Sequence, residues 1–405
     1  MIKVRLFSQI ISKLDSYKFK SLVKKHQTHK HEKGFNSWSH LVSMLFFQFA
    51  NSQSVRDISN GLGSATANLN HLGVLKAPST STLSYQNKNR SWELFRDYYY
   101  MLLKSLAPQS YTKGVNLKIK SNIFLLDATT ISLCLSLFDW ATYRTNKGAI
   151  KMHPLLDYDG HLPAYVNISD GKTADNKGAY ARPLLAGSVI VADRFYNDFS
   201  LLNVWDSNKV FVVIRHKDHF IFKTIKELEL PKTKHQHLLK DESIQLKGNK
   251  TKETYPKRLT RVALWDDKNQ QTIELITNNT TWSANTIAEL YKARWQVEIF
   301  FTDIKQQLHI KSFVGTSEQA VMIQIWTALI TILLLKALKG QAKYSWYLSN
   351  LVAFIRLNLF VKVDLQMWLD NPFQKAEPPP KKIIKGFFFE KINVLIDKPV
   401  QPLNL

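Results

Sequence analysis

The sequence predicts an α/β protein in which a β-rich centre lies between helical segments. Apolar residues follow helical spacing up to about residue 110, strand-like apolar runs begin after Lys120, and helical spacing returns near residue 281. With 405 residues, 45% of them hydrophobic, the chain can form more than one core. We expect five segments, at 1–110, 118–203, 204–280, 281–340 and 341–405.

The first segment is expected to be a helical DNA-binding domain. Its first thirty residues contain eight Lys or Arg and one acidic residue, Asp15, which suits a helix lying against phosphates or an ordinary solvated surface. Ser54 and Ser79 are typical helix N-caps, and the helices they begin could form a helix-turn-helix DNA reader or a plain helical bundle. In the DNA-binding interpretation, the residues available to touch DNA are Ser84, Gln86, Asn87 and Arg90.

The second segment has the strand order of a ribonuclease-H-like fold. A strand is expected over residues 122–133, a hairpin turns near Asp159 and Gly160, a helix follows over 175–185, and residues 187–193 form a buried strand. Three antiparallel strands, a helix and a further strand are the opening half of that fold. Such a fold hosts many chemistries, so the order alone does not establish a function.

The remaining segments differ in pattern. Residues 204–280 are expected to be a β-rich insertion, because β-prone runs surround the basic stretch from Lys232 to Arg261. Residues 281–340 are helical in spacing and should complete the core. Residues 341–405 should begin with helices and end in a Pro-rich linker and a tail.

The chain carries a large positive charge. Lys and Arg number 55 against 32 Asp and Glu, which gives a formal charge of +23 and a pI near 9.8. This excess indicates a polyanionic partner, nucleic acid first and an anionic membrane second. Cys134 is the single cysteine, which excludes a disulfide framework and a thiolate zinc site and suits a reducing cytoplasm.

Nothing in the sequence predicts a membrane span. Lys13 and Asp15 interrupt the N-terminal apolar run, which also lacks a cleavage site of small residues, so no signal peptide is expected. The most apolar stretch, Ala320–Leu335, has 16 residues and contains the polar Gln324, so a buried core helix is expected. We expect a cytoplasmic protein with no membrane partner.

Two carboxylates follow apolar strands. Asp127 comes directly after IFLL, and Asp193 directly after VIVA. Burial of either charge without compensation would be costly. Two strand-borne carboxylates and a third on a neighbouring helix can hold divalent cations that act on a phosphodiester, and Glu298 is the natural third ligand. Taken singly, each Asp could instead cap a turn, and Glu298 could pair with Arg294.

Residues 291–308 are expected to form one helix with two unlike faces. At about 100° per residue, four polar-tipped side chains share one narrow stripe: Tyr291, Arg294, Glu298 and Lys305. The apolar side chains fall elsewhere on the wheel: Val297, Phe300, Phe301, Ile304 and Leu308. An exposed Arg–Glu pair would contribute only about 0.2–0.5 kcal/mol. Together with the two distant aspartates, the stripe favours a functional face.

This combination resembles the DDE transposases of bacterial insertion sequences. The stripe has the spacing Tyr-(2)-Arg-(3)-Glu-(6)-Lys that defines the family-four group, and LLDATTISL and VADRFYNDF lie upstream in the expected order. The similarity covers roughly residues 120–340 and extends to KGAIKMH, DGKTADNK and KSFVGTSEQAV. At the second aspartate the group often has Asp-Arg-Gly-Tyr, whereas Phe195 stands at the glycine position here.

The resemblance implies a cut-and-paste DNA transposase that cleaves and joins DNA at insertion-sequence ends. The catalytic residues, and the ligands of two Mg²⁺ or Mn²⁺ ions, would be Asp127, Asp193 and Glu298. The residues that grip DNA beside the scissile phosphate would be Tyr291, Arg294 and Lys305. A hairpin intermediate with a flipped base is implied as well, and Trp265 or Trp282 could supply a stacking surface.

The resemblance also implies partners and a location. Double-stranded terminal inverted repeats and target DNA would be bound by a homodimer in a synaptic complex, in the bacterial cytoplasm at the nucleoid. Two other functions remain open. One is a structure-specific nuclease of the same fold, which would need no clamp for a flipped base. The other is a non-catalytic DNA-binding protein derived from a transposase, against which the presence of all three carboxylates counts.

Overall fold

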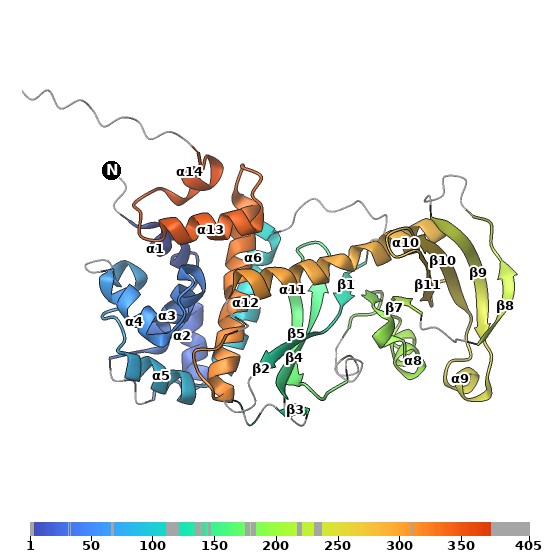
Figure 1. Ribbon diagram of the computed structural model, residues 1–405, viewed down its shortest axis with the longest axis horizontal. Coiled ribbons are helices and arrows are strands. Elements are labelled where there is room, and N and C mark those ends of the chain that lie inside the picture. The colour runs from blue at the N-terminus through green and yellow to red at the C-terminus, as the bar shows by residue number, and fades with distance from the viewer. Residues whose placement is uncertain are drawn as a thin grey trace, which may run out of the picture.

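The computed structural model describes residues 4–30, 32, 34–65, 69–110, 121–133, 138, 140, 142–144, 147–174, 179, 184–216, 221–230, 237–308, 310 and 312–373. Both ends of the chain contribute to a helical body, the central sheet lies beside it, and the sheet continues into a β-rich end (Figure 1). This mixed α/β arrangement confirms the predicted fold class.

The N-terminal part is helical, as its apolar spacing predicts. Its elements are α1 (Leu6–Ile11), α2 (Ser16–Lys25), α3 (Ser37–Ala50), α4 (Val55–Ser64), η1 (Leu69–Leu72), α5 (Thr80–Asn89) and α6 (Glu93–Ser110). Both predicted N-caps are present: Ser54 accepts a hydrogen bond from the amide of Asp57, and Ser79 from that of Thr82.

Two of the residues expected to touch DNA from α5 are buried instead. Asn87 is 2% exposed and hydrogen-bonds His40 at 2.7 Å, and Arg90 is 4% exposed and pairs with Glu32 at 3.3 Å. Burial lowers the pKa of His40 to about 3, so this imidazole is neutral and belongs to the core. Asn87 and Arg90 therefore stabilise the helical body, and Ser84 remains exposed.

The long apolar helix α12 (Glu318–Gln341) is the core of the helical body. It packs against α3, α5 and α6, and 94% of its most apolar window is buried within the protein. Its length and hydropathy would suffice to cross a membrane, but this packing accounts for its composition. The expectation of a buried core helix is confirmed.

The two ends of the described chain are hydrogen-bonded to each other. The amides of Leu6 and Phe7 donate to the carbonyls of Val361 and Leu359, each at 2.9 Å. The Gln9 side chain donates to the carbonyl of Val363 and accepts from the amide of Leu365. These contacts join α1 to the segment between α13 (Leu348–Asn358) and α14 (Leu365–Asp370), and so close the helical body. The Pro-rich linker and tail lie outside the described residues.

The central sheet has the strand order β5–β4–β1–β6–β7, with β4 antiparallel to its neighbours and β1, β6 and β7 parallel. These are the strands of a ribonuclease-H-like core. Their bounds are β1 (Ile123–Leu126), β4 (Lys147–Asp157), β5 (Pro163–Asp170), β6 (Val189–Ala192) and β7 (Phe211–Arg215), with β2 (Thr129–Leu133) and β3 (Thr142–Arg144) also on β4.

Two sequence predictions in this region need comment. The strand expected over residues 122–133 is divided into β1 and β2, which both pair with β4 and are separated by Asp127 and Ala128. The predicted hairpin between β4 and β5 is present. The helix expected over 175–185 lies largely outside the described residues.

The β-rich region extends the same sheet. Beyond β7 the order continues β11–β10–β9–β8, and the elements are α8 (Phe199–Ser207), β8 (Phe222–Glu227), β9 (Leu238–Leu246), α9 (Asn249–Thr254), β10 (Leu259–Asp266) and β11 (Gln271–Thr277). Because β7 pairs in parallel with β6, it belongs to the core. An insertion starting at residue 204 would include this core strand, so we propose that the insertion begins after Arg215.

The helix expected over residues 291–308 is two helices in line, α10 (Ala284–Ala293) and α11 (Trp295–Gln307) (Figure 1). At the junction the amide of Arg294 bonds the carbonyl of Tyr291, and the amide of Val297 bonds that of Arg294, each at 3.0 Å. These three-residue spacings tighten the turn locally. Arg294 keeps α-helical backbone angles, so the rod continues. The predicted apolar face is buried throughout.

Candidate active site

Asp127 and Asp193 leave adjacent parallel strands at the same height. In the register of β1 and β6, Leu126 pairs with Ala192, and each is followed directly by an aspartate. Neighbouring strands are about 4.8 Å apart. The two carboxylates expected from the sequence therefore stand at one edge of the sheet, at the carboxyl ends of its parallel strands, where α/β folds commonly place their ligands.

Burial and charge repulsion perturb Asp127. Its side chain is 22% exposed, and its carboxylate accepts the amide of Ala128 at 2.7 Å. Burial raises the pKa of Asp127 to about 6, and repulsion from Asp193 and Glu298 adds to this, while Ala128 and Arg294 oppose it. Asp193 and Glu298 are thus both within electrostatic reach of Asp127, and a cation beside Asp127 would be stabilised.

Arg294 supplies the positive charge at this place. Its Nη1 lies 3.3 Å from Asp127 Oδ2, and its Nη2 lies 2.7 Å from Glu298 Oε1. The side chain is 11% exposed, and its guanidinium lies 5.7 Å from the ring centres of both Tyr291 and Trp295. Its Nε–H is buried and has no hydrogen-bond partner among the described residues. One donor of this side chain therefore remains for a further acceptor.

The other two members of the predicted stripe flank this centre. Lys305 donates from Nζ to Thr129 Oγ1, at the start of β2 and two residues beyond Asp127. Tyr291 is half-buried, and burial raises the pKa of its phenol. Lys305 therefore reaches the strand that follows Asp127, while Tyr291 contacts Arg294 from the α10 side.

Phe195 is compatible with the turn after Asp193. Residues 194–196 form the 3₁₀ turn η2 (Arg194–Tyr196), and a 3₁₀ backbone has negative φ angles that any side chain tolerates. Phe195 is 58% exposed, so its ring needs no internal space. The departure from glycine therefore does not disturb the local fold.

An aromatic pocket of about 450 Å³ opens beside Tyr291. Trp265 and Trp295 line it together with the apolar Leu264 and Ile273 and the cation Lys268. This volume is within the range of about 300–1,000 Å³ usual for ligand pockets. Sequence reasoning named Trp265 and overlooked Trp295, although Trp295 directly follows Arg294 and lies outside the apolar face.

Trp282, the other tryptophan considered, belongs to the packing. Its ring contacts Phe211 of β7, with centres 5.4 Å apart, and it is packed against the main core. It does not line the pocket beside Tyr291.

The donor set fits a divalent cation, although the side chains are paired with Arg294. Among the described residues, no three His, Cys, Asp or Glu side chains form a ready metal cluster. The groups that converge, Asp127, Asp193 and Glu298, supply the hard carboxylate oxygens that Mg²⁺ and Mn²⁺ prefer. Two of them already hold a cationic guanidinium. These carboxylates therefore form a site suited to binding a cation.

A ribonuclease-H-like sheet with carboxylates at adjacent strand ends and a third on a following helix is an arrangement suited to metal-assisted phosphodiester chemistry. The model of the transposase DDE domain matches residues 118–334, so the chain belongs to this family. It is therefore a DDE transposase, a class of enzyme that acts on DNA and uses divalent metal ions. A second model, of a domain of unknown function (DUF4372), matches residues 3–75.

Curated relatives have names that agree with this family. A probable transposase for insertion sequence element IS5377 of Geobacillus stearothermophilus is 28% identical over 278 residues, which span 68% of this chain and 72% of the relative. A protein of Sinorhizobium fredii named as transposase y4zB is 28% identical over 264 residues, which span 64% of this chain and 71% of the relative.

Proposed function

We propose that the protein is a cut-and-paste transposase of the family-four group, which cleaves insertion-sequence ends and joins them to target DNA through a hairpin intermediate. The observation that carries this proposal is the meeting of Asp127, Glu298 and the guanidinium of Arg294 next to Asp193. A bare nuclease would need the carboxylates alone. Here one of the carboxylates, Glu298, lies on the same helical rod as Tyr291, Arg294 and Lys305, the residues of the predicted DNA clamp.

Asp127, Asp193 and Glu298 are the proposed catalytic residues and would hold two Mg²⁺ or Mn²⁺ ions. Such ions, when bound, activate the attacking oxygen of water or of a 3′-hydroxyl and stabilise the leaving oxygen. The raised pKa of Asp127 indicates that a nearby cation would stabilise the charged form of this carboxylate. Its position in the break between β1 and β2 leaves its second oxygen directed to the Arg294 side.

Arg294 and Lys305 are proposed to bind the DNA backbone beside the scissile phosphate. When the Arg294 side chain leaves the carboxylates, its Nε–H, which is buried and has no hydrogen-bond partner among the described residues, would become available to a phosphate oxygen, and the guanidinium can donate in a fork. Lys305, which donates to the neutral hydroxyl of Thr129, would turn to a phosphate oxygen. Tyr291 would orient Arg294 through its ring.

The aromatic pocket is proposed to hold the base that is displaced when a hairpin forms. Trp265 and Trp295 offer ring faces to any base, and Lys268 and Lys292 on its rim can attract the flanking phosphates. Its contact with Tyr291 places it directly beside the clamp.

The partners are proposed to be double-stranded terminal inverted repeats and target DNA. A homodimer would hold two ends in a synaptic complex in the bacterial cytoplasm at the nucleoid, because both ends must be cut together. The helical segment 1–110 is proposed to bind the element ends. Segments 118–203 and 281–340, together with β7 (Phe211–Arg215), would form the catalytic core, and 341–405 the C-terminal region. The formal charge of +23 supports binding to DNA throughout.

The test is Mn²⁺-dependent processing of a labelled element end, taken from the inverted repeats that flank the gene. Wild type should give nicked, hairpin and strand-transfer products, and Glu298→Gln should give none of them while still binding the end. Asp303→Asn, an acid-to-amide change on the same helix outside the proposed set, is the matched control and should remain active. Equal cleavage by wild type and Glu298→Gln would overturn the assignment. Nicks without hairpin or strand-transfer products would instead identify a nuclease.

A further inference from the structure

The N-terminal helix α2 presents a lysine face that the catalytic site does not use. Phe19 and Leu22 are buried on its inner side, whereas Lys20 and Lys24 are exposed on its outer side, one turn apart. At a rise of about 1.5 Å per residue their backbone positions are about 6 Å apart along the helix. Tyr17, 83% exposed, lies on the same helix with its ring centre 5.7 Å from Lys20 Nζ.

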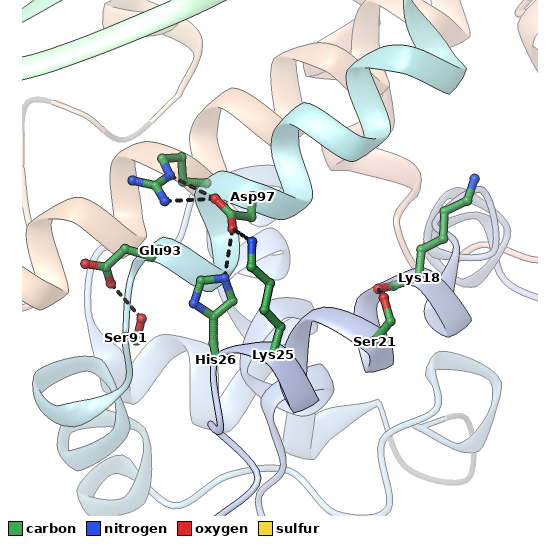
Figure 2. A network of polar contacts seen from close by, with 8 residues as sticks. Lys18, Ser21, Lys25, His26, Ser91, Glu93 and Asp97 are labelled. Carbon is green, nitrogen blue, oxygen red and sulfur yellow. Dashed lines mark hydrogen bonds and ion pairs between the residues drawn. The ribbon is translucent and has the colours of Figure 1, made fainter.

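Acidic side chains near α2 are already neutralised by other cations. Asp15 caps the helix and pairs with Lys18 at 3.4 Å. Asp97 of α6 binds Lys25 and His26, each at 2.9 Å, on the inner side of the helix (Figure 2). Lys20 and Lys24 contact no carboxylate among the residues that the structure describes. Within the described part of the chain, these two exposed cations thus have no counter-ion.

The face is also rigidly positioned. The ring of Phe19 contacts Trp38 and Tyr98 edge to face, with centres 5.6 and 4.8 Å apart. The hydrogen bonds from Lys25 and His26 to Asp97 hold the C-terminal end of α2 against α6 (Figure 2). The long lysine side chains remain mobile, but the helix that carries them does not need to be ordered on binding, which lowers the entropic cost of association.

We infer that the outer face of α2, with Lys20, Lys24 and Tyr17, is a duplex-DNA backbone contact and that this is the role of the domain matched over residues 3–75. The inference rests on the proposed function, since it takes DNA as the partner, but it assigns a surface remote in sequence from the clamp. The lysines bind adjacent phosphates as point charges, and the Tyr17 hydroxyl is a neutral donor beside them.

The test measures how the DNA affinity of the whole chain depends on salt concentration, in wild type and in two double variants. The probe is a labelled random-sequence duplex, titrated in EDTA at several KCl concentrations. Each lost phosphate contact reduces the slope of log K against log salt by about 0.9, so Lys20→Gln with Lys24→Gln should reduce it by about 1.8. The matched control, Lys209→Gln with Lys362→Gln, removes two exposed lysines elsewhere and should leave the slope unchanged.

Melting temperatures must first show that both double variants are folded. A slope reduced in the α2 variant alone supports the inference. Equal slopes in wild type and the α2 variant overturn it, and so does binding of wild type to anionic vesicles in preference to the duplex. Metal-dependent cleavage of an element end by wild type is measured in parallel. If cleavage persists while the slopes are equal, the proposed function stands and the α2 contact fails; absence of both binding and cleavage refutes the proposed function itself.

Discussion

Arg294 and Glu298, one helical turn apart, are joined by a hydrogen bond of 2.7 Å, and the same guanidinium reaches Asp127 at 3.3 Å. A cation that the sequence assigns to DNA therefore neutralises two of the carboxylates assigned to metal. We therefore predict that a metal ion bound at these carboxylates would displace Arg294 and free it to bind DNA, so that the two events form one exchange.

The first prediction concerns this exchange. Arg294→Ala should lower the stability of the protein in EDTA by roughly 1–3 kcal/mol, because Asp127 and Glu298 lose their shared donor. Mn²⁺ should then raise the melting temperature of the variant more than that of wild type. Lys292→Ala removes an exposed charge from the adjoining helix α10, where Lys292 contacts no carboxylate among the described residues, and its response to Mn²⁺ should match wild type. An equal Mn²⁺ response of Arg294→Ala and wild type would refute the exchange.

The second prediction concerns pH. The pKa of Asp127 is raised by burial from 3.8 to about 6, so the folded protein retains a proton that the unfolded chain releases. This destabilises the folded state as pH rises from about 4 to 6, by up to about 3 kcal/mol at about 1.4 kcal/mol per pKa unit. In EDTA, Asp127→Asn should therefore be more stable than wild type at pH 7 and similar to it at pH 4. Urea unfolding at the two pH values checks this, and parallel pH profiles would contradict it.

The third prediction concerns the aromatic pocket. Trp295→Ala should reduce hairpin formation about fivefold or more, since stacking of one base contributes about 1–3 kcal/mol. The first nick requires no displaced base and should be little changed. Trp295→Phe keeps a ring face and should restore much of the hairpin yield, and Trp282→Ala tests a tryptophan outside the pocket. Loss of nicking and hairpin products in the same proportion would rule out a role specific to the base.

The fourth prediction concerns the contact between α2 and α6. Asp97 accepts hydrogen bonds from Lys25 and His26 (Figure 2), and also from Arg96. Burial acts to raise its pKa, but these donors prevail and lower it to about 2. A lowered pKa stabilises the fold above pH 3.8 and loses that effect as pH falls toward 2. Asp97→Asn should thus destabilise the protein clearly at pH 7 and much less at pH 3 in chemical unfolding. A destabilisation equal at both pH values would point to packing rather than charge.

Some parts of the site follow from the sequence because they depend on local pattern. Short β-branched runs such as VIVA are buried on both faces in a parallel sheet, so an aspartate directly after one is placed by the strand itself. The helix that carries Glu298 could also be predicted from local pattern, because the spacing of its apolar residues determines which side is buried.

Other parts depend on contacts between distant segments. The polar helix α5 buries Asn87 and Arg90 against His40 and Glu32, and its own sequence offers almost no apolar pattern to show which side faces inward. The pairing of Arg294 with Asp127 joins residues 167 positions apart. The pocket of Trp265 and Trp295 needs β10 and α11 to meet, and such meetings are set by the packing of whole elements.

The hydrogen bonds from Leu6 and Phe7 to Val361 and Leu359 have a consequence for synthesis. A ribosome releases the first helix long before it makes the segment that binds it. The nascent N-terminal helices must therefore wait, with part of their backbone unpaired, until the catalytic sheet and α12 have been translated. A message truncated before residue 359 would yield a chain whose lysine-bearing helices are present but whose helical body cannot close.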